Sequence, residues 1–145
     1  MPTISWHFIH QYAYIYAKLI NSNFQKYNHL LIIHEEKDKE ALEVIDKNIS
    51  FRIFNLKDSL NKELNNNLKI QNFNQKYISL SILSELYVRN SSRRFADKML
   101  TKHLNAYHKA FTKFNPIAHI SEKPSSLSTN ASFTVAEKLK IKFIS

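Results

Sequence analysis

The chain of 145 residues contains no cysteine and no glycine. The lack of cysteine excludes disulfides, thiol catalysis and thiolate metal sites, and it fits a reducing compartment. The lack of glycine excludes the GxGxxG dinucleotide fingerprint and the Walker loop, because both need glycine where the backbone approaches a phosphate. Ordinary NAD-binding and P-loop functions are therefore excluded, and we expect no cofactor.

Long apolar runs and targeting segments are missing as well. No stretch approaches the roughly 18 apolar residues that a membrane span needs. The first residues, Met1 to Trp6, lack the basic flank and the cleavage site of a signal peptide. We therefore expect a cytoplasmic protein. With 43% hydrophobic and 23% charged residues, the composition predicts one folded domain over residues 1–145.

Acidic residues are in the minority. The 21 Lys and Arg residues exceed the 12 Asp and Glu residues, which gives a formal net charge of +9. This excess favours an anionic partner such as nucleic acid, an anionic membrane surface or a phosphorylated substrate. The positive charges are spread along the chain, however, and their densest cluster is Arg89, Arg93 and Arg94. A solvated, lysine-rich surface explains the same charge equally well.

Short apolar runs alternate with amphipathic segments along the whole chain. Hydrophobic periodicity predicts strands at 4–9, 29–34, 49–54, 117–121 and 141–144. It predicts helices at 13–24, 38–47, 58–68, 77–88, 93–114 and 125–139. We expect five strand residues to be buried, namely Leu31, Ile33, Ile53, Ile120 and Phe143.

The alternation predicts an α/β domain with a Rossmann-like, open parallel sheet of about five strands and helices on both faces. Right-handed crossovers between parallel strands give the strand order 3-2-1-4-5. This order places the first and fourth strands side by side. In open α/β sheets, ligands bind at such a switch point, in the crevice outside the carboxyl ends of the strands.

Two parts of the sequence resemble bacterial glycosyltransferases. Residues 104–144 combine a long helix, the corner Lys113-Phe114-Asn115-Pro116, a strand and a serine-rich helix start. This pattern resembles the amino-terminal domain of surface-polysaccharide glycosyltransferases of GT-B type. The front of the chain, with Trp6-His7-Phe8-Ile9-His10, looks like the opening of glycosyltransferases that act on lipid-linked carriers. It departs from them at His10-Gln11-Tyr12, where many of those enzymes have glycines.

The resemblance implies an acceptor-side domain of a glycosyltransferase for capsule, O-antigen or a related glycan. Such enzymes hold the nucleotide-sugar donor mainly in a second, carboxyl-terminal domain, for which 145 residues leave no room. We therefore expect the amino-terminal half of a two-domain enzyme, inactive alone, whose partners are that missing domain and a lipid- or glycan-linked acceptor. Peripheral contact with an anionic membrane is also expected.

Other functions remain open at this point. One alternative is a non-enzymatic basic module that binds nucleic acid or an anionic surface, although no nucleic-acid motif supports it. Another is a stand-alone α/β interaction domain.

The candidate site lies where the first and fourth strands end. We predict His10 and Glu122 as the catalytic residues, either of which can act as general base toward an acceptor hydroxyl. The amides that open the helix near Ser125 can bind a phosphate. The substrate-binding residues are predicted to be Gln11, Ser121, Ser125 and Ser126. The alternative is that the serines only cap the helix and that His10 is a surface residue.

No metal site is predicted. His7 and His10 are expected on opposite faces of a strand, and His103 and His108 are five positions apart on a helix, so neither pair has the spacing for shared coordination. The segment His34-Glu35-Glu36 ends the second strand and either contacts a ligand sugar or forms an ordinary charged turn.

Overall fold

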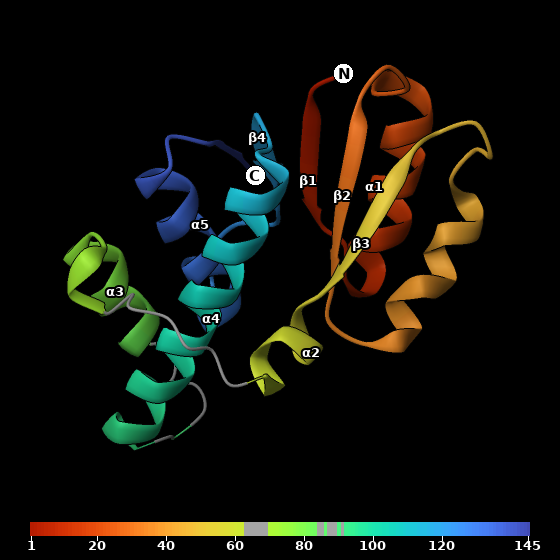
Figure 1. Ribbon diagram of the computed structural model, residues 1–145. Coiled ribbons are helices and arrows are strands. Elements are labelled where there is room, and N and C mark those ends of the chain that lie inside the picture. The colour runs from red at the N-terminus through yellow and green to blue at the C-terminus, as the bar shows by residue number, and fades with distance from the viewer. Residues whose placement is uncertain (63–69, 84–85, 87–89, 91) are drawn as a thin grey trace.

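The computed structural model describes residues 1–62, 70–83, 86, 90 and 92–145 (Figure 1). The ends of the predicted helices 58–68 and 77–88, and Arg89, lie outside these residues. In chain order the elements are β1 (Thr3–His7), α1 (His10–Asn23), β2 (Asn28–Ile33), the 3₁₀ helix η1 (Glu36–Val44), β3 (Phe51–Asn55), α2 (Leu56–Asn61), the 3₁₀ helix η2 (Ile70–Asn72), α3 (Gln75–Leu83), α4 (Arg93–Phe114), β4 (Ala118–Ile120), α5 (Leu127–Lys138) and β5 (Lys142–Ile144).

The five strands form one parallel sheet in the order β3-β2-β1-β4-β5. The predicted fold class and strand order are therefore confirmed. Trp6 of β1 is in register with Leu31 of β2 on one side and with Ile120 of β4 on the other. The carboxyl ends of β1 and β4 consequently lie at the same edge of the sheet.

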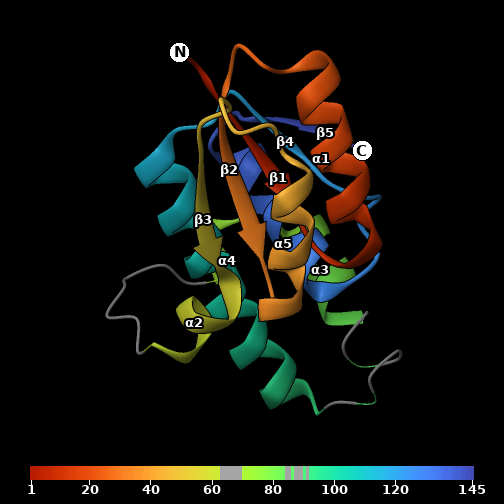
Figure 2. The ribbon, with the colours of Figure 1, turned by 90° about the vertical axis from the view of Figure 1, so that its right-hand side faces the viewer.

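Helices cover both faces of the sheet. Figure 2 looks onto the face covered by α1 and η1, and the other helices lie behind the sheet. Leu31 and Ile33 belong to the core under α1 and η1, whereas Leu30 and Ile32 belong to the core under α2 to α5. Side chains alternate between the faces along a strand, so the part of β2 that is covered on both faces, 30–33, is apolar at every position.

Burial is weaker toward the two edges of the sheet. Leu31 and Ile33 are fully buried, as predicted, but Ile53 is 38% exposed, so its predicted burial is wrong. Ile53 lies on the edge strand β3, which has a neighbouring strand on one side only. Ile120 and Phe143, near the opposite edge, are only partly buried.

Backbone positions that usually require glycine are occupied by other residues. Asn115, at φ 47°, closes α4 in the left-handed region, and its N–H bonds to the carbonyl of Phe111. Asparagine tolerates this conformation better than most residues. His10, Asn90 and Lys140 also have positive φ values. A glycine-free chain thus builds its left-handed corners from histidine, asparagine and lysine, at some cost in strain.

Among the described helices, none is both long enough and apolar enough to span a bilayer.

A buried hydrogen-bond chain ties the first two strands together. The fully buried Trp6 donates from Nε1 to Nδ1 of His29 at 2.9 Å. The Nε2 of His29 lies 2.9 Å from the carbonyl oxygen of Phe24 and must donate to it. The His29 ring is therefore neutral, with its proton on Nε2. Burial lowers the pKa of His29 and so favours this state.

A double-mutant cycle tests this link. Trp6→Phe leaves a buried nitrogen of His29 without a donor, and His29→Leu leaves the Trp6 N–H without an acceptor. Each loss costs on the order of 1–3 kcal/mol of unfolding free energy. In urea denaturation, we expect the double variant to lose less unfolding free energy than the two single variants lose together, by at least about 0.5 kcal/mol. Strict additivity would contradict the proposed hydrogen bond.

Candidate functional site at the switch point

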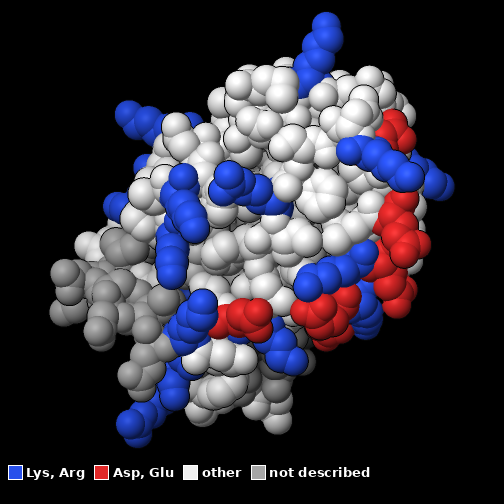
Figure 3. All heavy atoms as spheres, turned by 45° about the vertical axis from the view of Figure 1, so that its right-hand side comes forward, with Lys and Arg blue, Asp and Glu red and all other residues white. Residues whose placement is uncertain are grey.

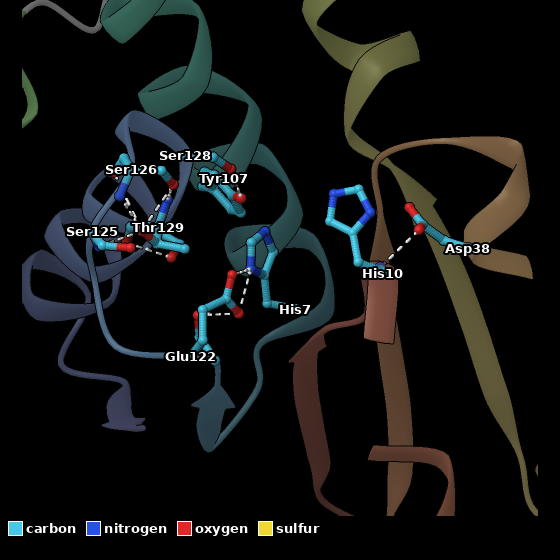
Figure 4. Close-up of polar contacts among 11 residues, drawn as sticks. His7, His10, Asp38, Tyr107, Glu122, Ser125, Ser126, Ser128 and Thr129 are labelled. Carbon is cyan, nitrogen blue, oxygen red and sulfur yellow. Dashed lines mark hydrogen bonds and ion pairs between the residues drawn. The ribbon is translucent and has the colours of Figure 1, made fainter. Parts of the chain in front are cut away.

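The pairing of β1 with β4 brings a histidine and a carboxylate together. His7 is the last residue of β1, and Glu122 follows β4. The Nδ1 of His7 lies 3.0 Å from each of the two carboxylate oxygens of Glu122 (Figure 4). The His7 side chain is 1% exposed and that of Glu122 is 17% exposed. Glu122 is therefore the member of the pair that a ligand can reach.

The two residues fix each other's protonation. Burial raises the pKa of Glu122, but its hydrogen bond and charge interaction with His7 outweigh burial and leave the pKa lowered. Glu122 is thus a carboxylate at neutral pH. Because Nδ1 of His7 faces two carboxylate oxygens, it carries a proton. The other ring nitrogen, Nε2, is buried and has no hydrogen-bond partner among the residues that the structure describes.

A second polar pair lies deeper in the same face of the sheet. Ser5 Oγ is 2.7 Å from Nδ1 of His119, and both side chains are fully buried. The His119 ring is surrounded by Tyr107, Phe111 and Phe143. Burial, and secondarily the charge of His7, lower the pKa of His119 well below 6.5, so its ring is neutral. Complete burial makes this pair structural, since no ligand can reach it.

The start of α5 is closed by its own side chains. Ser126 is the N-cap and accepts from the N–H of Thr129 at 3.2 Å. The Thr129 hydroxyl in turn accepts from the N–H groups of Ser125 and Ser126. One position before Thr129, the Ser128 hydroxyl lies 2.7 Å from the Tyr107 hydroxyl. The capping role that we weighed for these serines is therefore present at Ser126.

A hollow of about 170 Å³ opens beside this helix start. At roughly 30 Å³ for each water molecule, it has room for about five or six waters, the size of an amino-acid side chain rather than of a nucleotide. Apolar groups and a few polar groups line it together, a mixture that is typical of ligand pockets. The lining residues are His34, Leu60, Met99, His103, Ser126, Leu127 and Ser128.

Asp38 organises the loops that follow β1 and β2. Its buried carboxylate accepts from the N–H of His10 at 2.9 Å, from that of His34 at 3.0 Å and from that of Glu35 at 2.9 Å. Burial raises the pKa of Asp38, but these backbone hydrogen bonds outweigh it and leave the pKa lowered. Figure 4 shows His10 and Asp38 on one side of the view and the His7–Glu122 pair on the other.

The predicted site residues are only partly brought together. The Ser121 hydroxyl donates to Glu122 at 3.4 Å, and Ser126 lines the hollow. His10 and Gln11 open α1 with exposed side chains, and Glu122 pairs with His7 rather than with His10. Whether these residues act on a ligand stays a prediction.

Sequence reasoning missed four residues of the site, namely His7, Asp38, Tyr107 and Ser128. A signal for His7 was present, because Ser5 and His7 alternate with Ile4 and Trp6 in a buried strand and so place a polar stripe inside the domain.

The other charged groups that the sequence drew attention to carry ordinary surface interactions. Arg93 pairs with Asp97 at 3.2 Å on the exposed side of α4. Glu35 pairs with Lys37 at 3.2 Å. Across the described ranges, no three His, Asp or Glu side chains are grouped so that they could hold a metal ion.

No protein-family model matches the chain, and no curated protein sequence matches it either. A solved structure, of a CDPS (cyclodipeptide synthase) from Fluoribacter dumoffii, matches with a TM-score of 0.53 and 12% sequence identity. The match covers 99% of this chain and 87% of that chain. At this identity the likeness shows the fold.

The function that we predicted from the sequence is wrong. The structure that shares the fold along nearly the whole chain is a cyclodipeptide synthase, not a glycosyltransferase, and this overturns the acceptor-side glycosyltransferase domain. The basic binding module is not supported either. On the face that Figure 3 shows, lysine and arginine side chains are scattered, and acidic residues lie among and beside them, so no continuous basic stripe forms there.

Three histidines whose pKa values are lowered predict that acid destabilises the fold. The pKa values of His29, His34 and His119 are lowered from 6.5. Around and below that pH the unfolded chain takes up protons at these rings more readily than the folded chain does, so stability falls as pH drops from about 7 to about 5. A histidine that stays neutral throughout contributes about 2 kcal/mol to this loss.

His119→Leu provides the test. In this variant the Ser5 hydroxyl can still donate to the carbonyl oxygen of Ala118, which lies 3.3 Å away. We expect the variant to lose less unfolding free energy than the wild type between about pH 7 and pH 5, measured by urea denaturation. An equal or larger loss in the variant would show that His119 titrates normally.

Proposed function

We propose that this chain is an acyl-transfer enzyme that forms amide bonds between amino acids, with the His7–Glu122 pair as its proton acceptor. The pair is the observation that carries the proposal. It places an ionised, partly exposed carboxylate, oriented by a buried histidine, at the switch point where ligands of open parallel sheets bind.

The shared fold supports amide chemistry in particular. Making a cyclodipeptide requires two amide bonds. In each step an amine nitrogen forms a bond to an activated acyl carbon, the bond from that carbon to its leaving group breaks, and the amine gives up a proton. A base within reach of the amine is therefore needed. The Glu122 carboxylate takes that proton and can pass it to the departing group.

His7 has the orienting role. Its Nδ1–H contacts both carboxylate oxygens, which fixes the plane of the Glu122 carboxylate. His7 itself is buried, so it acts through Glu122 rather than on the substrate.

The hollow beside α5 can bind part of the substrate. Its volume suits one amino-acid side chain, and Leu60, Met99 and Leu127 supply apolar contacts. The hydroxyl groups of Ser126 and Ser128 are polar groups in the same wall. Burial raises the pKa of Tyr107, so its phenol keeps its proton in the bond with Ser128 and holds that serine in place.

The test uses the full chain and activated amino acids. Purified protein is incubated with aminoacyl thioesters of leucine or phenylalanine, and mass spectrometry follows the formation of linear and cyclic dipeptides. We expect product above the uncatalysed background, and about a 10²-fold or larger loss of rate in Glu122→Gln, because an amide cannot accept the proton.

Glu137→Gln is the matched control. Glu137 is an exposed residue near the end of α5, and the same chemical change there should leave the rate unaltered. Failure of the folded wild-type chain to form any amide product from these donors, or full activity of Glu122→Gln, would overturn the proposed function.

A further inference from the structure

We propose that Asp38 is a positioning residue that locks the segments following β1 and β2 at the carboxyl edge of the sheet, and so sets where His10 and His34 lie. This role rests on the proposed function, because it matters to a reaction only if the carboxyl edge of the sheet binds the substrate. The contacts themselves are properties of the free chain.

One carboxylate holds both loops. Oδ1 of Asp38 accepts from the backbone of His10, which lies after β1, and Oδ2 accepts from the backbone of His34 and Glu35, which lie after β2. Asp38 is 3% exposed, so water cannot easily replace these bonds. Charge-assisted hydrogen bonds of this kind are about twice as strong as neutral ones.

The His10 backbone needs such a restraint. It has a φ of 50°, which places a residue with a Cβ atom in the left-handed region at the first position of α1. The cap residue before it, Ile9, offers no side-chain hydrogen bond to the helix. Strain of this type persists only where the surroundings over-determine the conformation, and it gathers at functional sites. The carboxylate of Asp38 is the group that holds it here.

The same residue fixes His34, which lies in the wall of two hollows at this edge. One is the hollow of about 170 Å³ beside α5, and the other is an open groove of about 460 Å³ toward β3 and α2. Burial first, then the charge of His7, lowers the pKa of His34, and Glu35 and Asp38 oppose this. The further groups that face His34 are His10 and His103, together with Glu36, Lys37, Lys57 and Asp58 in the groove.

The first experiment is a stability cycle between Asp38 and His10. Asp38→Asn removes one of the two accepting oxygens, and thermal unfolding should show a Tm several degrees below that of the wild type. His10→Gly relieves the positive φ without touching Asp38. If Asp38 holds a strained backbone that relaxes when the carboxylate is changed, the released strain offsets part of the loss at His10, so Asp38→Asn should lower the Tm clearly more in the His10→Gly background. Equal losses in both backgrounds would overturn the restraint.

The second experiment measures the effect of the Asp38 charge on the pKa of His34. A merely structural role of Asp38 would leave that pKa unchanged. NMR titration of the imidazole C–H signals should give a lower pKa for His34 in Asp38→Asn than in the wild type. Asp46→Asn, at an exposed aspartate beyond η1, is the matched control and should leave that pKa unchanged. Asp38→Glu keeps the charge but displaces the oxygens, so it should lower the Tm while holding the His34 pKa closer to the wild-type value.

The third measurement joins the inference to the reaction. Amide formation from aminoacyl thioesters should fall at least tenfold in Asp38→Asn and stay unchanged in Asp46→Asn. One outcome is that the folded wild type forms no amide while the Asp38–His10 stability cycle and the His34 titration give the expected results. In that case the proposed function is wrong, and the positioning role of Asp38 is supported. An unmoved His34 pKa, or an uncoupled cycle, overturns the role of Asp38 whatever the activity.

Discussion

The parallel pairing of β1 with β4 is the constraint on which the site depends. His7 and Glu122 are 115 positions apart in the sequence, and they meet because β1 and β4 end side by side at one edge of the sheet. The same pairing places Ser5 opposite His119 and buries both. Each of these contacts needs the closure of a long loop, so the pairing must be stable before the polar groups can find one another.

Burying polar groups in this sheet has a chemical consequence. His29 and His119 are held neutral because burial disfavours their charged forms, whereas Glu122 and Asp38 remain ionised because hydrogen bonds outweigh burial. The protein thus separates neutral rings inside the sheet from carboxylates at its carboxyl edge. A negative group fixed at the switch point is suited to accept a proton or to hold an amine.

The fold could be predicted from the sequence to a large extent. The apolar run around Leu31 and the long stripe over 93–114 gave clear strand and helix signals, and the alternation of elements gave the sheet order. The exposure of Ile53 was missed because an apolar side chain was taken as buried, although the predicted strand order already placed its strand at the edge of the sheet. The segment after β2 was predicted as a helix over 38–47 and is a 3₁₀ helix over Glu36–Val44. The Asp38 carboxylate in this helix accepts from three N–H groups of the adjoining segments.

The site was less accessible to sequence reasoning. The ends of the predicted strands were enough to place Glu122 and Ser126 at the carboxyl edge of the sheet. The partner of Glu122 could not be predicted, because it depends on the direction of side chains. His7 points to the α4 face, whereas the exposed His10 belongs to α1. The resemblance to glycosyltransferases reflected features that many parallel α/β domains share, such as a helix ending before a proline and a serine-rich helix start. Such features specify the fold and leave the chemistry open.

The central claim is that His7 holds Glu122 as an oriented carboxylate at the switch point. A long-range ¹H–¹⁵N NMR spectrum of the His7 imidazole at neutral pH tests this most directly. We expect a proton on Nδ1 of His7 that exchanges slowly with water, and faster exchange of that proton in Glu122→Gln. An unprotonated Nδ1 in the wild-type chain, or an Nδ1 proton that is indifferent to Glu122→Gln, would contradict it.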